Sequence, residues 1–144
     1  MRSSEKALII GQLADAKKAK EVLILDLSSL TDIAEFFVVA SGASERQVKT
    51  VSESVEAGMK EKGMRPLSME GYHEGRWVII DYGDVVLHTF LEPLRELYDL
   101  ESLWIEATRY KINEEHKLLG VEHAKGKTRI FQEKTAEDES GPTR

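Results

Sequence analysis

Apolar side chains at helical spacing mark two helices in the first half of the chain. In one of them a stripe recurs every three or four residues, at Val48, Val51, Val55 and Met59, the pattern of a helix with one buried face. Ser44 and Gln47 match a capping box at its start, and Gly63 is suited to its end. The other helix is predicted after Ser3 or Ser4, either of which can cap it, with its apolar stripe at Ile9, Leu13 and Ala16.

Two apolar segments without helical spacing predict central strands. Residues 22–25 and 36–40 are short, rich in β-branched and aromatic residues, and without polar residues on either face. Strands of this kind are covered on both faces, so helices must lie on the sheet. Residues 65–69 predict a further short strand. With the hairpin described next, the chain is α/β in class and contains about five strands.

The clearest local pattern is a hairpin around Gly83 and Asp84. Residues 77–82 and 85–90 flank this pair, and glycine in first position is typical of a two-residue type II′ turn. The resulting register places Tyr82 opposite Val85, Ile80 opposite Leu87 and Val78 opposite Thr89, on a face that should form core. The other face mixes apolar and ionisable side chains, namely Trp77, Ile79, Asp81, Val86, His88 and Phe90.

This mixed face has two interpretations. Asp81 and His88 are diagonal neighbours that could share a hydrogen bond, so they could be a buried structural pair. Alternatively the face is partly open, with Trp77 supplying apolar area and Asp81 supplying charge. Protein interfaces favour that combination at their strongest contacts.

The chain after the hairpin predicts two short helices and then a tail. Pro93 is suited to a first helical turn, and the apolar face runs through Leu94, Leu97, Tyr98, Leu103 and Trp104. Beyond Ala107 the charges alternate in sign and aromatic residues become sparse. We therefore predict a packed domain over residues 1–107 and a charged, flexible tail over residues 108–144, with transient helix around residues 114–119.

Acidic residues are concentrated in the middle of the chain, although the whole sequence has a net charge of −6. Residues 66–108 hold 9 Asp or Glu against 2 Lys or Arg, a net charge of −7, while the flanking segments are nearly balanced. A surface of this sign repels phosphate and attracts a basic protein. We expect little or no direct nucleic-acid binding. An acidic surface that only promotes solubility is the simpler alternative.

Several kinds of chemistry lack their usual residues. The chain has no cysteine, which excludes disulfides and thiolate nucleophiles. No histidine pair has metal-ligand spacing, and no predicted strand carries the Asp-x-Asp of two-metal phosphoryl transfer. No apolar run approaches the ~20 residues that span a bilayer, and the N-terminus lacks a secretory pattern. We expect a cytoplasmic protein with no membrane contact, metal or cofactor.

Residues 41–44 form a glycine-containing loop between a predicted strand and a predicted helix. Free backbone N–H groups at such a junction could hold a phosphate. The loop lacks the lysine of a P-loop and the three glycines of a dinucleotide motif, so ordinary helix capping is favoured.

Four segments, in order, resemble a known family. They are residues 32–48 (DIAEFFVVASGASERQV), the pair Glu70-Gly71, residues 77–90 (WVIIDYGDVVLHTF) and residues 95–104 (RELYDLESLW). On these motifs the chain resembles the ribosomal silencing factor family, RsfS/Iojap, over residues 4–107. Glu35-Phe36 departs from the Asp-Tyr usual in the family, which removes a hydroxyl group.

The resemblance implies a mixed sheet related in shape to nucleotidyltransferases but without their catalytic carboxylates. It also implies a non-enzymatic translational repressor. Such a repressor docks on the large ribosomal subunit through ribosomal protein number fourteen and sterically blocks joining of the small subunit. The residues carried over as its contact surface are Glu70, Trp77, Asp81, Asp84, His88, Arg95 and Tyr98. Charge and hairpin geometry independently favour the first three.

Two alternatives belong to other classes of protein. One is a nucleotidyltransferase-like enzyme that binds a nucleotide phosphate at residues 41–44. The other is a self-associating adaptor, a homodimer formed through the mixed face of the hairpin.

Overall fold

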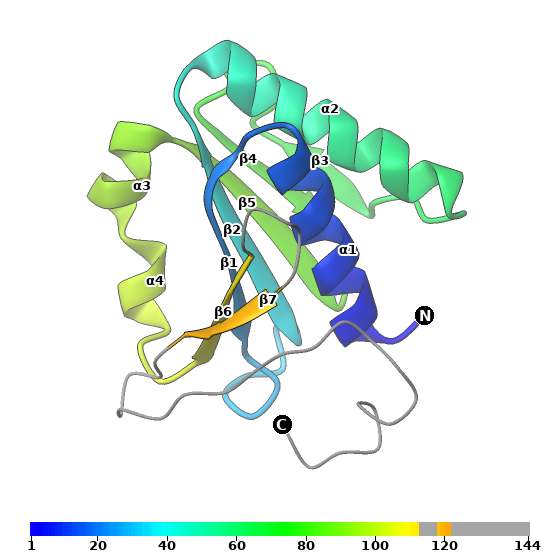
Figure 1. The fold of residues 1–144 in the computed structure, drawn as a ribbon, viewed down its shortest axis with the longest axis vertical. Coiled ribbons are helices and arrows are strands. Elements are labelled where there is room, and N and C mark those ends of the chain that lie inside the picture. The colour runs from blue at the N-terminus through cyan, green and yellow to red at the C-terminus, as the bar shows by residue number, and fades with distance from the viewer. Residues whose placement is uncertain (113–117, 122–144) are drawn as a thin grey trace.

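Helices are interspersed with groups of two or three strands along the chain, and the strands share one sheet, which confirms the predicted α/β class. The structure is a computed structural model that describes residues 1–112 and, as backbone, residues 118–121 (Figure 1). Its helices are α1 (Ser3–Ala16), α2 (Glu45–Glu61), α3 (Glu92–Tyr98) and α4 (Leu100–Leu103). Its strands are β1 (Lys20–Asp26), β2 (Phe36–Gly42), β3 (Ser68–Glu70), β4 (Trp77–Asp81), β5 (Val85–Leu91), β6 (Thr108–Ile112) and β7 (Leu118–Val121).

The described strands form one mixed sheet in the order β3-β4-β5-β2-β1-β6-β7. The central pair, β2 and β5, is parallel, and the other neighbouring pairs are antiparallel. The expectation of a mixed sheet is therefore confirmed. The predicted count of about five strands is too low, because β6 and β7 fall within the predicted tail.

The packed domain continues past the boundary predicted at residue 107. Strand β6 pairs with β1, with Tyr110 opposite Ile24, and both Tyr110 and Ile112 are buried. The segment alternates buried residues with the more polar Arg109 and Lys111, which is the pattern of a strand with one solvated side. A strand of this kind carries few apolar residues, so its alternating charges led to the prediction of a tail. Residues 113–117 and 122–144 lie outside the described residues, and so does most of the predicted tail.

Helices α1 and α2 pack on one face of the sheet (Figure 1). The predicted stripe of α2 is confirmed, since Val48, Val51, Val55 and Met59 are fully buried. The predicted stripe of α1 is only partly confirmed: Ile9 and Leu13 are half-buried and pack against the core, but Ala16 is exposed. The residues that the helix buries most fully are Ala7, Leu8, Ile10, Gly11 and Ala14. Small residues let α1 approach the sheet closely: a Cβ atom on Gly11 would lie 2.5 Å from Cδ1 of Ile112. Close backbone approach at the small residues and burial of Leu8 and Ile10 together define this face.

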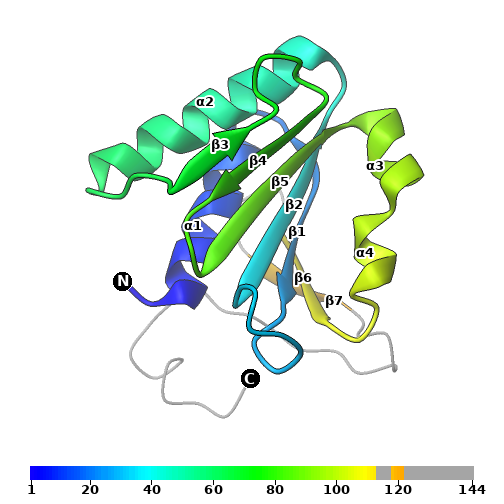
Figure 2. The same cartoon turned by 180° about the vertical axis from the view of Figure 1, so that it is seen from behind.

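The other face of the sheet is covered by the segment that contains α3 and α4. Leu25, Phe37, Val39, Val86 and Phe90 form a second core there, against Leu94, Leu100 and Trp104. The inner residues of β2 are therefore covered on both sides, as its continuous apolar run predicts, and all its residues are buried. In Figure 2 the helices α3 and α4 lie beside the β1 and β2 part of the sheet, and none of the described helices lies over β3 and β4 on this face.

Candidate interaction surface

The hairpin formed by β4 and β5 has the register that the sequence predicts. Val78 pairs with Thr89 and Ile80 with Leu87, and the N–H group of Tyr82 donates to the carbonyl oxygen of Val85. Gly83 has a φ of 93°, which suits the first position of the turn. The side chains on the predicted core face pack beneath α1 and α2. The other face is therefore the one that carries the ionisable residues.

The mixed face is open over its outer strands. Ile79 lies opposite Glu70 of β3 on one side and opposite His88 of β5 on the other, so the three side chains share a face. Glu70 is exposed, and Trp77, Ile79 and Asp81 are half-buried. This region, together with Tyr98 of α3, is called the open flank below: Glu70, Trp77, Ile79, Asp81 and Tyr98.

An aromatic cluster holds Trp77 at the centre of the open flank. The indole ring lies 4.8 Å from the ring of Phe90 and 4.8 Å from the ring of Tyr98. Its Nε1 atom donates a hydrogen bond to Nδ1 of His88, at 3.2 Å. Tyr98 is 55% exposed, so the cluster leads from the buried Phe90 to the protein surface.

His88 lies inside the protein rather than on its surface. Burial lowers its pKa to about 4, and the nearby carboxylate of Asp81 opposes this shift only in part. The two residues do not form the hydrogen bond that their diagonal placement suggested. Oδ1 of Asp81 instead accepts the backbone N–H of Gly83 at 2.7 Å. His88 is therefore neutral and serves as an acceptor for Trp77.

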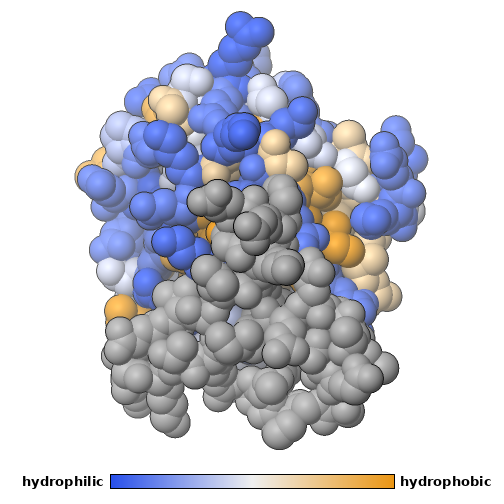
Figure 3. All heavy atoms as spheres, viewed as in Figure 1, coloured by the Kyte–Doolittle hydropathy of each residue, from blue (hydrophilic) through white to orange (hydrophobic). Residues whose placement is uncertain are grey.

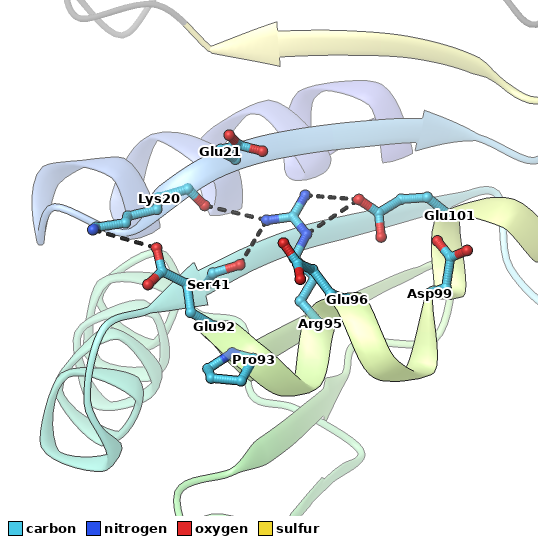
Figure 4. Close-up of a pocket in the computed structure, with 9 residues that line it drawn as sticks. All are labelled: Lys20, Glu21, Ser41, Glu92, Pro93, Arg95, Glu96, Asp99 and Glu101. Atoms are coloured by element: carbon cyan, nitrogen blue, oxygen red, sulfur yellow. Dashed lines mark hydrogen bonds and ion pairs between the residues drawn. The ribbon is translucent and has the colours of Figure 1, made fainter.

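Arg95 is also internal, although it was predicted to contact a partner. Its guanidinium group donates to Oε2 of Glu101 at 3.0 and 3.1 Å, to Oγ of Ser41 at 2.8 Å, and to the carbonyl oxygen of Lys20 at 3.3 Å. Figure 4 shows it reaching between β1, β2 and α4. Arg95 thus fixes the α3 and α4 segment to the sheet.

Arg95 lies at the base of a cleft of about 430 Å³ whose lining is mainly acidic. The lining residues drawn in Figure 4 are Lys20, Glu21, Ser41, Glu92, Pro93, Arg95, Glu96, Asp99 and Glu101. Lys20 forms an exposed ion pair with Glu92 at 3.3 Å. The cations of the cleft are therefore engaged by its own carboxylates.

The predicted contact residues divide into two groups. Glu70, Trp77, Asp81 and Tyr98 come together on the open flank. Asp84 lies at the hairpin turn, where its carboxylate accepts from Nζ of Lys6 at 2.7 Å. With His88 and Arg95 it belongs to the internal framework of the domain. The three were carried over from the resemblance, and a sequence motif does not reveal which of its side chains are engaged within the protein.

Sequence reasoning missed several exposed apolar residues in the segment that contains α3 and α4. Leu97 and Leu103, which were expected to face the core, are 72% and 71% exposed, and Ile105 is 50% exposed. Arg95 takes the inner position on α3, and Asp99 then has a left-handed φ of 49°, which redirects the chain before α4. On the α1 and α2 side, hydrophilic residues form most of the visible described surface, with smaller hydrophobic areas (Figure 3).

Residues 41–44, predicted as a loop, span the end of β2 and the N-cap of α2. Their polar groups are occupied by interactions of the chain itself. Oγ of Ser44 accepts the N–H of Gln47 at 3.0 Å, as predicted, and Oε1 of Gln47 accepts the N–H of Ala43 at 2.7 Å. Oγ of Ser41 already accepts from Arg95. These donors and acceptors are not directed at an open site, which favours capping over phosphate binding.

Neither a metal site nor a membrane-spanning helix occurs among the described residues. Within them, no cluster of three or more His, Asp or Glu side chains has the arrangement of a metal site. None of the described helices is long and apolar enough to cross a bilayer.

Comparison with known proteins assigns the chain to a family. The family model described as "Ribosomal silencing factor during starvation" matches residues 1–141. The chain belongs to the ribosomal silencing factor family. The match continues well past residue 107, where the resemblance seen in the sequence was expected to end.

Individual ribosomal silencing factors are similar over most of their length. The factor RsfS of Chromobacterium violaceum is 43% identical over 97 residues, which cover 67% of this chain and 79% of that protein. The factor RsfS of Halalkalibacterium halodurans is 37% identical over 107 residues, which cover 74% of this chain and 92% of that protein. A crystal structure of a protein from C. violaceum has a TM-score of 0.71 and 38% identity, and covers 72% of this chain and 87% of that one. The similarity to nucleotidyltransferases stays a prediction.

Proposed function

We propose that this chain is a translational repressor that binds the large ribosomal subunit and keeps the small subunit from joining it. Relatives that are 43% and 37% identical over the aligned residues are named ribosomal silencing factors. The observation that carries the proposal is the open flank, where a fixed tryptophan lies between acidic side chains and exposed apolar ones. Surfaces of this composition bind proteins, because the apolar area drives association and the charges orient it.

The chemistry of the flank favours a basic protein as the partner, and ribosomal protein number fourteen is the one we propose. Glu70 and Asp81 supply negative charge beside Trp77, and the acidic segment 66–108 extends this field. Tyr98 and Leu97 supply exposed apolar area on the adjacent helix. A partner with Lys or Arg side chains around an apolar patch would complement both features.

Repression by occupying space on the ribosome requires no chemical step, and the flank offers no group that is ready to catalyse one. Its one nearby imidazole is buried and neutral, and Asp81 is hydrogen-bonded to the turn. Neither residue is therefore poised as a general base towards an external molecule. In the proposed mechanism the bound domain fills space that the small subunit needs.

Charge-neutralising substitutions on the flank test this function. Glu70→Gln with Asp81→Asn removes two charges while an oxygen remains at residue 81 to accept the N–H of Gly83. Cosedimentation with purified large subunits at moderate salt should show about tenfold weaker binding, because each charge contributes up to ~1 kcal/mol at an exposed interface. Unchanged binding by a folded double variant would contradict docking through this flank.

A matched control uses carboxylates that lie elsewhere. Asp32 and Glu61 are exposed on a loop and at the end of α2, and Asp32→Asn with Glu61→Gln changes the net charge equally. The control should bind as the parent does. Adding small subunits to large subunits preloaded with the parent should then show reduced joining, and normal joining would contradict the repressor function.

Self-association through the same flank stays a prediction. Light scattering of the protein with and without large subunits tests it. If a dimer uses the flank, adding large subunits should convert it to bound monomer.

A further inference from the structure

The hydrogen bond between Trp77 and His88 joins the open flank to the centre of the sheet. We propose that His88 is a positioning residue for the interaction surface: its Nδ1 accepts the indole N–H and sets the orientation in which Trp77 meets the partner. This inference rests on the proposed function and names the residue that organises its surface.

His88 is itself rigidly held. It lies in β5, between Val39 of the parallel strand β2 and Ile79 of β4. Only 6% of its surface is exposed, and its ring lies 4.5 Å from the ring of Phe37. A side chain enclosed in this way has little rotational freedom. It therefore offers Trp77 an acceptor in a fixed place.

Ring stacking alone does not determine the orientation of Trp77. The rings of Phe90 and Tyr98 each lie 4.8 Å from the indole and restrict its plane. An indole flipped by 180° occupies the same plane and keeps most of that contact, but its N–H group then lies at the opposite edge. The acceptor on His88 distinguishes the two orientations, because an indole N–H near a buried region needs a partner.

The cost of placing an imidazole here indicates that packing is not its role. Nδ1 accepts a hydrogen bond, so the ring proton of the neutral form is on Nε2. Nε2 is buried and has no hydrogen-bond partner among the described residues. A phenylalanine would fill the same space beside Phe37 and Phe90 without an unpaired polar atom. The imidazole is therefore explained by what Nδ1 does for Trp77.

The chemistry offered to a partner follows from this arrangement. The N–H group of Trp77 is directed into the protein, so the exposed part of the indole presents carbon atoms. Partner groups that meet Trp77 are then apolar side chains or the stems of Lys and Arg, with polar contacts left to Glu70, Asp81 and Tyr98.

The test compares His88→Phe with His88→Asn in the full chain. Phenylalanine keeps the ring but lacks an acceptor, while asparagine loses the ring but can place an amide oxygen near the position of Nδ1. The indole N–H signal of Trp77 is assigned by NMR with Trp77→Phe, since the chain has two tryptophans. In the free protein, His88→Phe should speed exchange of this proton with water about tenfold, and His88→Asn should keep more of the protection.

Binding to large subunits is then measured in a double-mutant cycle. His88→Phe should weaken binding about fivefold in the parent and cause no further loss when Trp77→Phe is already present, because it acts through Trp77. An equal loss in both backgrounds would overturn the positioning role, as would unchanged exchange of the indole proton in His88→Phe. If the parent itself does not bind large subunits, the proposed function is overturned. If the parent binds large subunits and His88→Phe binds them equally well, only the positioning role is overturned.

Discussion

Replacing Arg95 by methionine should destabilise the domain even though the residue lines an open cleft. The substitution keeps an apolar stem and removes four hydrogen bonds, two to Glu101 and one each to Ser41 and the carbonyl of Lys20. It leaves the carboxylate of Glu101 without its partner. The side chains of Arg95 and Glu101 are 9% and 17% exposed.

The expected cost is about 3 kcal/mol. Breaking a buried ion pair by removing one partner costs roughly 3 to 5 kcal/mol, because the remaining charge stays desolvated. Glu101 keeps partial access to water, which places the value at the lower end. The comparison is Lys20→Met, which breaks the ion pair between Lys20 and Glu92. Both of those side chains are about half exposed, so this loss should stay below ~1 kcal/mol.

Urea denaturation followed by circular dichroism measures both variants, with the free energy of unfolding extrapolated to water. Arg95→Met combined with Glu101→Gln should cost less than the sum of the single changes, because the second change removes the stranded charge. If Arg95→Met is no more destabilising than Lys20→Met, the hydrogen bonds of Arg95 are not what holds α3 and α4 in place. The prediction that Arg95 contacts a partner would then regain support.

Three further predictions concern other parts of the domain. Gly71 and Gly63 both have a φ of 82°, but a Cβ atom on Gly71 would lie 2.1 Å from the carbonyl oxygen of Trp77, while one on Gly63 meets nothing within 4 Å. Calorimetry should therefore show a loss of about 1 kcal/mol for Gly63→Ala and roughly 3 kcal/mol or more for Gly71→Ala. The pKa of His88 is about 4 in the folded state against 6.5 ordinarily, so the unfolded chain takes up the proton first as the pH falls. The free energy of unfolding should therefore be highest above pH 6.5 and fall by about 3 kcal/mol in total towards pH 4. Denaturation measured across this range should show a smaller fall for His88→Phe. Leu97→Ser with Leu103→Ser should leave the melting temperature nearly unchanged, since both side chains are over 70% exposed, yet weaken cosedimentation with large subunits; intact binding would exclude this apolar area from the interface.

Local patterns predicted the parts of the fold that depend on neighbours in the chain. The register of the hairpin followed from Gly83 and Asp84, because a two-residue turn leaves one way to pair the strands. The stripe of α2 followed from helical spacing, and the motifs in residues 32–104 identified the family. Charge and hairpin geometry also selected Glu70, Trp77 and Asp81, which do share the open flank.

Burial of individual side chains was decided only by the tertiary structure. Arg95 was carried over as a surface contact, and for His88 the sequence left burial and exposure open; both are buried. The guanidinium group of Arg95 is hydrogen-bonded to Ser41, which lies far away in the chain, while His88 accepts from Trp77 and keeps its Nε2 unpaired among the described residues. Leu97 looks like core and is exposed, because the inner position of α3 goes to Arg95. The strand at Thr108–Ile112 becomes recognisable through its pairing with β1, more than eighty residues earlier. Sequence periodicity reports which face a residue shares with its neighbours, whereas exposure depends on what packs against that face from elsewhere.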